Sequence, residues 1–473
     1  MSTLGFGACG AGSSGVTTGG VLAQLIALGA ADTHLSLNPT NTFWRTRVQK
    51  ATNYAMESIL QTFTGGVGWG QEVQITINRT GDLIYWMYVL IDIPAIAALQ
   101  SPSAGVCSTR FPVADACDPC GDGAEPNTCV DYIPAEPDAP DDVEGIDSCT
   151  GLQTPFANWV NEIGHAALDR VCFSIGGQVI DTLYSHFLHM WEELSGQPGK
   201  RLEEMIGKRF TRAALVADSQ RARRLYVPLP FYFTRHSGNA LPLVSLQFHS
   251  VQINVAFANI ERMIQVSDCD VTVVKCSDGQ AITSNDISAV LDTTYIYLDM
   301  DERDRFAVGS FQQLITQLQQ FSTTATGTNI RAQLNFNHPT IELIWAVQRK
   351  CQADANNTFN YSGFYGLDPV LAAGLRINNL PRFSREGAYF RMVQPYEKHS
   401  LIPKSYVYNY GFALHPEDCQ PSGSLNFSRI DNVEMNIDLQ PELSGETVSL
   451  IVFCRNWNLL RFKEGLGGVL FSN

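Results

Sequence analysis

Charged side chains are scarce in this chain of 473 residues, where Asp, Glu, Lys and Arg supply 17% of positions and apolar residues 45%. This balance excludes a disordered polar chain and favours extensive buried sheet or large permanent interfaces. Basic clusters are also few, and the densest one falls within 208–224. A phosphate-binding groove needs clustered excess Lys and Arg, so we expect no direct nucleic-acid binding.

Targeting and membrane signals are missing as well. The apolar stretch 19–31 has no Lys or Arg before it, because the first basic residue is Arg45, so it does not resemble a signal peptide. No run reaches the ~18 apolar residues of a membrane helix. We therefore expect synthesis and folding in the cytosol, where the twelve cysteines would be reduced.

The motifs of the common enzyme classes are absent from the sequence: there is no phosphate-binding loop, no Gly-x-Ser-x-Gly and no His-Glu-x-x-His. His186 and His189 are one helical turn apart, with Glu192 and Glu193 close by, and this spacing suits a metal if further ligands converge. The same pattern is typical of a satisfied amphipathic helix, which we favour. We expect no catalytic, cofactor-binding or metal-binding residue, no cofactor and no enzyme activity.

The segment 101–150 has a different composition from the rest of the chain. Its eleven acidic residues face a single base, Arg110, so it supplies −10 of the net charge of −15. It is rich in Pro and Gly and predicts a long loop, 95–150. Three states are open for its cysteines, namely disulfides, a zinc site or free thiols; they are Cys107, Cys117, Cys120, Cys129 and Cys149.

Alternation of apolar and polar residues is the dominant pattern outside that loop, and it predicts half-buried strands. The segments that follow it are 72–78, 246–255, 340–347, 433–439 and 447–453. The segment 83–93 is a longer run of β-branched and aromatic residues that also predicts a strand. Gly176 and Gly177 predict a hairpin turn between 171–175 and 178–180. Helical spacing favours a helix over 155–170, and Asp181 is a candidate N-cap for a second helix that contains Trp191. The two halves thus share one plan, which indicates two antiparallel sandwiches in series.

Several blocks of the sequence resemble one family, and they follow its order from about residue 35 to the end. They include 37–44, 52–58, 81–88, 175–181, 191–194 and 240–247, then the most specific block, 420–431, and the closing 467–473. The family is that of the major capsid proteins of nucleocytoplasmic large DNA viruses, in the marseillevirus, iridovirus and phycodnavirus branches. The motif residues that we single out as structural are Gly176, Gly177, Asp181, Trp191, Pro421, Gly423, Asn426, Arg429 and Asp431.

The resemblance implies an all-β fold of two consecutive eight-stranded antiparallel jelly rolls, a double jelly roll, with short helices in long loops. We expect a flexible N-terminal arm at 1–30, a first jelly roll at 31–215 and a second at 216–473. The boundary follows the charged, weakly patterned stretch 209–224. Pro421–Asp431 would be a turn in which Asn426 and Arg429 hold backbone groups, and Trp191 a core or subunit-contact residue.

The same resemblance implies a structural protein of the virion, assembled in the host cytoplasm. Its homotrimers would be pseudo-hexagonal capsomers that tile an icosahedral shell. The expected partners are neighbouring capsomers and minor capsid and penton proteins, with the arm 1–30 facing inward toward those proteins or an inner membrane. The acidic loop would face outward. Two alternatives are a jelly-roll spike that binds carbohydrate, which needs an exposed aromatic cluster, and a sandwich-fold enzyme, which needs converging His or carboxylate groups.

Overall fold

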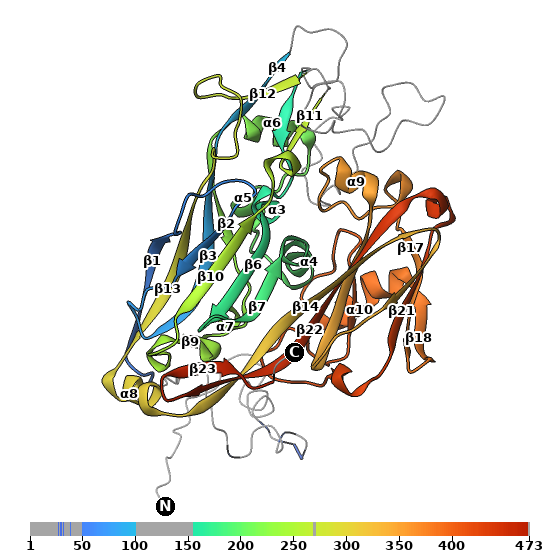
Figure 1. Ribbon diagram of the computed structural model, residues 1–473. Helices are drawn as coiled ribbons and strands as arrows, with labels where there is room; N and C mark the ends of the chain where they lie inside the picture. Colours follow the sequence, from blue (N-terminus) through green and yellow to red (C-terminus); the bar gives the residue numbers. More distant parts are fainter. Residues whose placement is uncertain are drawn as a thin grey trace, which may run out of the picture. The chain divides into compact units, whose positions relative to one another are not determined.

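The structure is a computed structural model that describes residues 50–100, 155–267 and 271–471, with a few isolated positions before residue 50 (Figure 1). Antiparallel strands dominate the described residues. The period-two segments form them because one face of each strand meets a core. The expected strands 83–93 and 433–439 are confirmed with the same bounds, as β3 (Leu83–Ile93) and β21 (Val433–Leu439).

The first sandwich has two four-stranded sheets, with the strand orders β1-β13-β3-β8 and β2-β10-β6-β7. A short strand, β9 (Leu241–Pro242), pairs with β3, and two small ribbons join β4 (Ile96–Gln100) to β12 (Val271–Lys275) and β5 (Ala157–Trp159) to β11 (Ile264–Val266). The other strands are β1 (Tyr54–Thr62), β2 (Glu72–Thr76), β6 (Leu168–Ile175), β7 (Gln178–Tyr184), β8 (Arg223–Pro228), β10 (Val251–Phe257) and β13 (Ser288–Leu298).

The second sandwich repeats this arrangement with the strand orders β14-β22-β16-β19 and β15-β21-β17-β18. The short strands β20 (Leu425–Asn426) and β23 (Leu466–Val469) extend the first of these sheets. The other strands are β14 (Phe311–Thr326), β15 (Asn329–Gln333), β16 (Pro339–Arg349), β17 (Val370–Ile377), β18 (Leu380–Glu386), β19 (Tyr408–Gly411) and β22 (Thr447–Lys463).

Both sandwiches follow one connectivity. In each, the last of eight strands returns to lie between the first and the third, and the seventh lies between the second and the fourth. This is the jelly-roll order, so the expected double jelly roll is confirmed. The pairing of β14 with β22, from Phe311↔Phe462 to Thr326↔Thr447, is longer than the corresponding pairing of β1 with β13.

The expected boundary between residues 215 and 216 is corrected by the strand pairing. β8, β10 and β13 all follow residue 216, yet they pair with strands that precede it. A jelly roll closes only when its last strand returns to its first, so the chain changes sandwich after β13, near α8 (Met300–Val308). The charged stretch that suggested a boundary is part of the first sandwich, where Arg209 and Arg223 pair with Asp218.

The helices lie in the connections between strands. The helix expected over 155–170 is wrong: the segment contains β5, then the short α3 (Ile163–Ala167), and β6 starts at Leu168. The apolar residues of this segment are buried although they do not lie on one helix. They are covered by neighbouring elements on several sides. The remaining helices include α4 (Ser185–Ser195), α5 (Glu203–Ile206), α6 (Arg212–Ser219), α7 (Tyr232–Arg235), α9 (Lys350–Asp354), the helical turn η5 (Tyr389–Val393) and α10 (Gln394–Lys398).

Two expectations near these elements also change. Asp181 does not cap α4, since β7 continues to Tyr184, which is the residue at the N-cap. The strand expected at 246–255 begins only at Val251, because Leu243–Ser245 forms a single 3-10 turn before it. In both places local propensity gives way to sheet pairing, which fixes where a strand begins and ends.

Candidate functional site at the junction of the two sandwiches

The sheet of the second sandwich that contains β16 and β22 is buried on both faces. Val452 and Cys454 of β22 belong to the core of the second sandwich, whereas Ile451 and Phe453 belong to the core of the first. β16 alternates in the same way, with Ile344 on the side of the first core. A strand with two buried faces needs a second layer, and here the first sandwich provides it.

Helix α4 is one of the parts of the first sandwich that meet this sheet, and β7 is another (Figure 1). The ring of Phe187 meets that of Phe453 edge-on, with the centroids 5.6 Å apart. The guanidinium groups of Arg235 and Arg455 each lie 4.2 Å from the centroid of the Trp191 ring. Cations over an indole are attracted by its π electrons, so Trp191 links an arginine of each sandwich.

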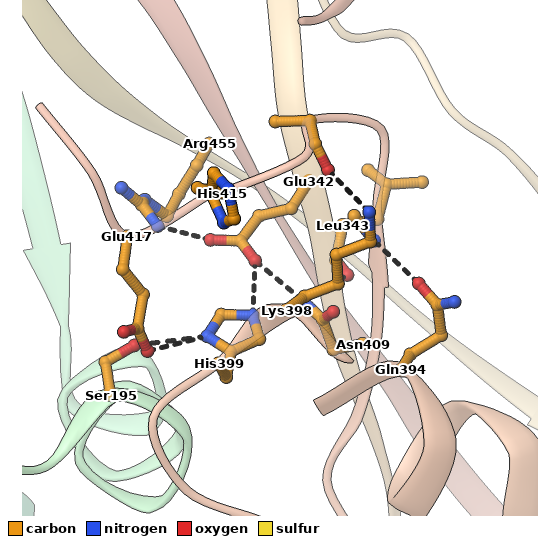
Figure 2. A network of polar contacts seen from close by, with 12 residues as sticks. Ser195, Glu342, Leu343, Gln394, Lys398, His399, Asn409, His415, Glu417 and Arg455 are labelled. Carbon is orange, nitrogen blue, oxygen red and sulfur yellow. Dashed lines mark hydrogen bonds and ion pairs between the residues drawn. The ribbon is translucent and has the colours of Figure 1, made fainter. Parts of the chain in front are cut away.

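A buried ion network lies beside Trp191 (Figure 2). The carboxylate of Glu342 is fully buried and accepts bonds from Arg455 Nη1, from His399 Nε2 at 2.8 Å and from Asn409 Nδ2 at 2.7 Å. Burial alone would raise the pKa of Glu342, but His399 and Arg455 outweigh it and lower the pKa to about 2. The carboxylate therefore stays ionised at any moderate pH.

His399 joins this network to the first sandwich. Its Nδ1 lies 3.1 Å from Glu417 Oε1 and 3.3 Å from the hydroxyl of Ser195, at the end of α4 (Figure 2). Burial would lower the pKa of His399, yet the two carboxylates raise it to about 9. The imidazole is thus a cation at neutral pH, and both of its N–H groups donate to carboxylates. The pKa of Glu417 is in turn lowered to about 2, against its burial.

A second charged cluster crosses the same junction. Lys208 Nζ lies 2.7 Å from Glu162 and 2.8 Å from Glu193, and His189 Nδ1 lies 2.7 Å from Glu162. From the second sandwich, the backbone N–H of Lys404 donates to Glu193 Oε2 at 2.8 Å. Desolvation opposes ionisation here, but Lys208 holds the pKa of Glu193 below its usual range.

Metal binding has one geometric candidate among the described residues, formed by Glu162, His189 and Glu193, whose ligand atoms lie within 4.8 Å of one another. The Lys208 ammonium already bonds both carboxylates, so the positive charge that a metal would bring is supplied. His186, the other histidine of the predicted pair, does not join this group, and its Nδ1 instead lies 2.8 Å from the hydroxyl of Tyr361. The carboxylates of Glu162 and Glu193 are therefore already paired with a cation of the chain itself.

The predicted motif residues fall in three places. Gly176 and Gly177 form the turn between β6 and β7, with φ of 58° and 83° that favour glycine. Asp181 is buried in β7 and accepts the backbone N–H of Leu318, in β14, at 2.9 Å, so it bonds across the junction. Trp191 lies in the junction between its two arginines.

The remaining motif residues surround β20. Asn426 Oδ1 accepts the backbone N–H of Ser428 at 3.0 Å, and Gly423 has a φ of 121°. Pro421, Arg429 and Asp431 are exposed. The motif is anchored by a residue that sequence reasoning did not single out, Phe427, which is buried in the core of the second sandwich.

The five cysteines singled out in 101–150 lie outside the described residues. Among the cysteines that the structure describes, Cys172, Cys276, Cys419 and Cys454 are free thiols and Cys351 is disulfide-bonded. No helix in the described part of the chain is both long and apolar enough to cross a membrane.

Sequence reasoning missed Glu342, His399, Arg455 and Lys208 as junction residues. A signal for two of them existed: Glu342 and Arg455 are charged residues inside otherwise apolar strand segments. A charge in such a place is buried only with a partner, so each predicts an opposite charge nearby. The partner itself could not be named, because Glu342 and Arg455 are brought together only by the register of β16 with β22.

Two family models match the chain. The model for the major capsid protein of large eukaryotic DNA viruses matches residues 302–468, and that for the N-terminus of the major capsid protein matches 42–109 and 143–299. The junction between the two models falls between residues 299 and 302, where the strand pairing also changes sandwich.

Individual relatives agree with these models. The major capsid proteins of Pyramimonas orientalis virus and Phaeocystis pouchetii virus are 34% and 31% identical, each over 96% of this chain and the whole relative. The quasi-atomic model of the PBCV-1 virus capsid covers 91% of this chain and all of its own, with 25% identity and a TM-score of 0.68. The Faustovirus major capsid protein, 12% identical, shares the fold with a TM-score of 0.64 over 92% of this chain and 94% of its own. The chain belongs to the major capsid proteins of large eukaryotic DNA viruses, and is a component of the virion capsid.

Proposed function

We propose that this chain forms homotrimeric, pseudo-hexagonal capsomers that tile an icosahedral viral shell. The observation that carries the proposal is the repeated strand order. One chain offers two sandwiches of the same connectivity, fused through a buried junction. Three such chains around a threefold axis present six similar sandwiches, which is the outline that packs into a hexagonal layer.

The junction supports a structural role rather than a catalytic one. Its carboxylates, Glu342, Glu162 and Glu193, each bond a cationic partner, and Glu342 is closed to solvent. A general acid or base needs a pKa near the working pH and access to a substrate. The pKa values of about 2 for Glu342 and about 9 for His399 lie outside that range, whereas burial raises the pKa of Glu192 on α4 to about 7.

Neighbouring capsomers, minor capsid proteins and penton proteins are the partners we propose for the assembled shell. In this arrangement the arm 1–30 faces inward, toward minor proteins or an inner membrane, and the loop 101–150 faces outward. The loop lies outside the described residues, and so does the arm apart from a few isolated positions. Synthesis and assembly would take place in the cytoplasm of the host.

Light scattering of the purified protein at rising concentration tests the proposal. The expected result is a stable mass of three chains, followed by larger assemblies at high concentration. A monomer that never associates would contradict the proposal and favour a discrete binding protein instead. Electron microscopy of the large assemblies then separates ordered hexagonal layers, which support the capsomer, from amorphous aggregate, which does not.

A further inference from the structure

The junction inside the chain joins two specific surfaces. One is the helix that follows the fifth strand of the first sandwich, α4 after β7. The other is the outer face of the β14-β22-β16-β19 sheet, on which Phe453 and Arg455 contact α4. Because the two sandwiches share one connectivity, the chain contains a second copy of each surface.

The second copy of the sheet surface is the outer face of β1-β13-β3-β8. Strand register places Leu60 opposite Asp292, Asp292 opposite Tyr88, and Leu90 opposite Tyr226, so these side chains share one face. Trp86 lies two residues before Tyr88 on the same face, and the two rings stack at 6.3 Å. Leu60 is 57% exposed and Tyr226 is 42% exposed. We call Leu60, Trp86, Tyr88 and Tyr226 the bare sheet face.

The second copy of the helix surface follows β18, as α4 follows β7. It consists of η5 and α10, Tyr389–Lys398, whose inner side packs through Phe390 into the core of the second sandwich. Its outer side leaves Met392, Val393 and Tyr396 exposed, the last at 78%. We call these three residues the bare helix face. In α4, by contrast, Phe187, Leu188 and Met190 are all buried.

We infer that the bare helix face of one copy of this chain packs on the bare sheet face of the next, in the same way as α4 packs on β22 within the chain. The inference rests on the proposed capsomer and names its contact surfaces. Each copy has one surface of each kind, so the contact is heterologous and runs head to tail, and a closed ring leaves neither surface exposed. An aromatic patch of this kind is typical of the centre of a protein interface.

Lysine substitutions at exposed residues of these two surfaces can disrupt the contact between copies without unfolding the chain. Leu60→Lys places an ammonium opposite Asp292 in the register, so the free chain tolerates it. The sheet variant is Leu60→Lys with Tyr226→Lys, and the helix variant is Met392→Lys with Tyr396→Lys. A lysine buried in the contact is expected to weaken each junction by about 30-fold or more. Val308→Lys, at a side chain 88% exposed on α8, is the matched control.

Native mass spectrometry of full-length chains, with circular dichroism to confirm folding, gives the readout. Each variant alone should be monomeric where the wild type and the Val308→Lys control are trimeric. Mixed together, the sheet variant retains an intact helix face and the helix variant an intact sheet face. They should therefore form one-to-one dimers that do not grow, a result that only a heterologous contact gives.

The outcomes separate this inference from the proposed function. If wild type and both variants are all trimeric, the capsomer stands and the inferred contact is wrong. If the variants are monomeric but their mixture forms no dimer, the surfaces do not face each other and the head-to-tail contact is overturned. A wild type that stays monomeric would overturn both. A fold lost in one variant is resolved by the single changes Leu60→Lys and Tyr396→Lys, read in the same way.

Discussion

The two sandwiches have the same strand order but bury different amounts of the same sheet. In the second, the outer face of β16 and β22 is covered by α4 and holds Phe453, Glu342 and Arg455. In the first, the corresponding face of β3 and β13 is open and holds Trp86 and Tyr88. This difference shows that the connectivity determines which surfaces a sandwich has. The side chains determine which of these surfaces is covered by another part of the same chain.

The largest expected effect comes from breaking the buried ion pair on the covered face. Glu342→Gln keeps the shape of the side chain but removes the carboxylate partner of Arg455 and of His399 Nε2, while His399 Nδ1 keeps Glu417. Breaking a buried pair in this way costs about 3–5 kcal/mol of the free energy of unfolding. Urea unfolding of the variant measures it. Arg224→Ala, which removes an exposed pair with Asp92 on the open face, is the matched control and should not change the stability of the free chain measurably.

A similar loss is expected from Phe453→Ala, because Phe453 lies in the core that joins the sandwiches and contacts Phe187. Removing a buried Phe side chain costs about 3–5 kcal/mol. Leu60→Ala on the open face should leave the stability of the free chain nearly unchanged. If both substitutions cost the same in thermal unfolding of the monomer, the open face is covered within one chain and the comparison fails.

The pH dependence of stability sharpens the comparison, since only the covered face contains a buried histidine between carboxylates. The folded pKa of His399 is raised to about 9, above an unfolded value near 6.5, so its contribution is complete below ~6.5 and is lost as pH rises through 9. Each unit of pKa difference corresponds to roughly 1.4 kcal/mol. Denaturation between pH 6 and 10 should show this loss in the wild type and a flatter profile in His399→Gln.

At acid pH the signs reverse. The folded pKa values of Glu342 and Glu417 are lowered to about 2, so their contribution is present above the unfolded pKa and declines as pH falls through 2. Unfolding measured from pH 5 down to pH 2 should therefore show the junction persisting below pH 4. A junction that opens near pH 4, where free carboxyl groups titrate, would contradict the geometry of the network.

The smallest effect is expected at Asp181. Burial raises the pKa of its carboxyl group to about 6. Its folded pKa exceeds its unfolded one, so ionised Asp181 lowers stability as pH rises through 4 to 6. Asp181→Asn keeps an oxygen that can accept the N–H groups of Leu318 and Thr182. Melting temperature at pH 7 should be unchanged or slightly higher. A large drop would mean that the negative charge itself is required.

Sequence periodicity predicted strands well where one face meets one core. It found β21 with its bounds, because an alternating pattern records a single buried face. The bounds of β3 came instead from its continuous run of β-branched and aromatic residues. The expected strand at 340–347 was found too, as part of β16, but its second buried face was not foreseen. Burial of Ile344 depends on a partner layer from elsewhere in the chain, and no local pattern records that.

The domain boundary was predicted at the wrong place and the ion network was not predicted, both for the same physical reason. Both depend on pairings between distant segments: β13 returns to β1, and β22 brings Arg455 beside Glu342. Composition pointed to the charged stretch around Arg223 as a linker, although its charges are locally paired. The family resemblance supplied the double jelly roll, which alternation alone could not distinguish from other sandwiches.

The burial of β22 on both faces has a consequence for the protein during translation. Translation completes the first sandwich, through β13, long before it reaches Thr447–Lys463 near the end of the chain. Until then Phe187 and Trp191 on α4 have no Phe453 or Arg455 to cover them. A nascent chain with exposed aromatic surface is prone to misassembly with its neighbours. The synthesis of β22 therefore ends the interval in which the first half of this capsid protein is most vulnerable on the ribosome.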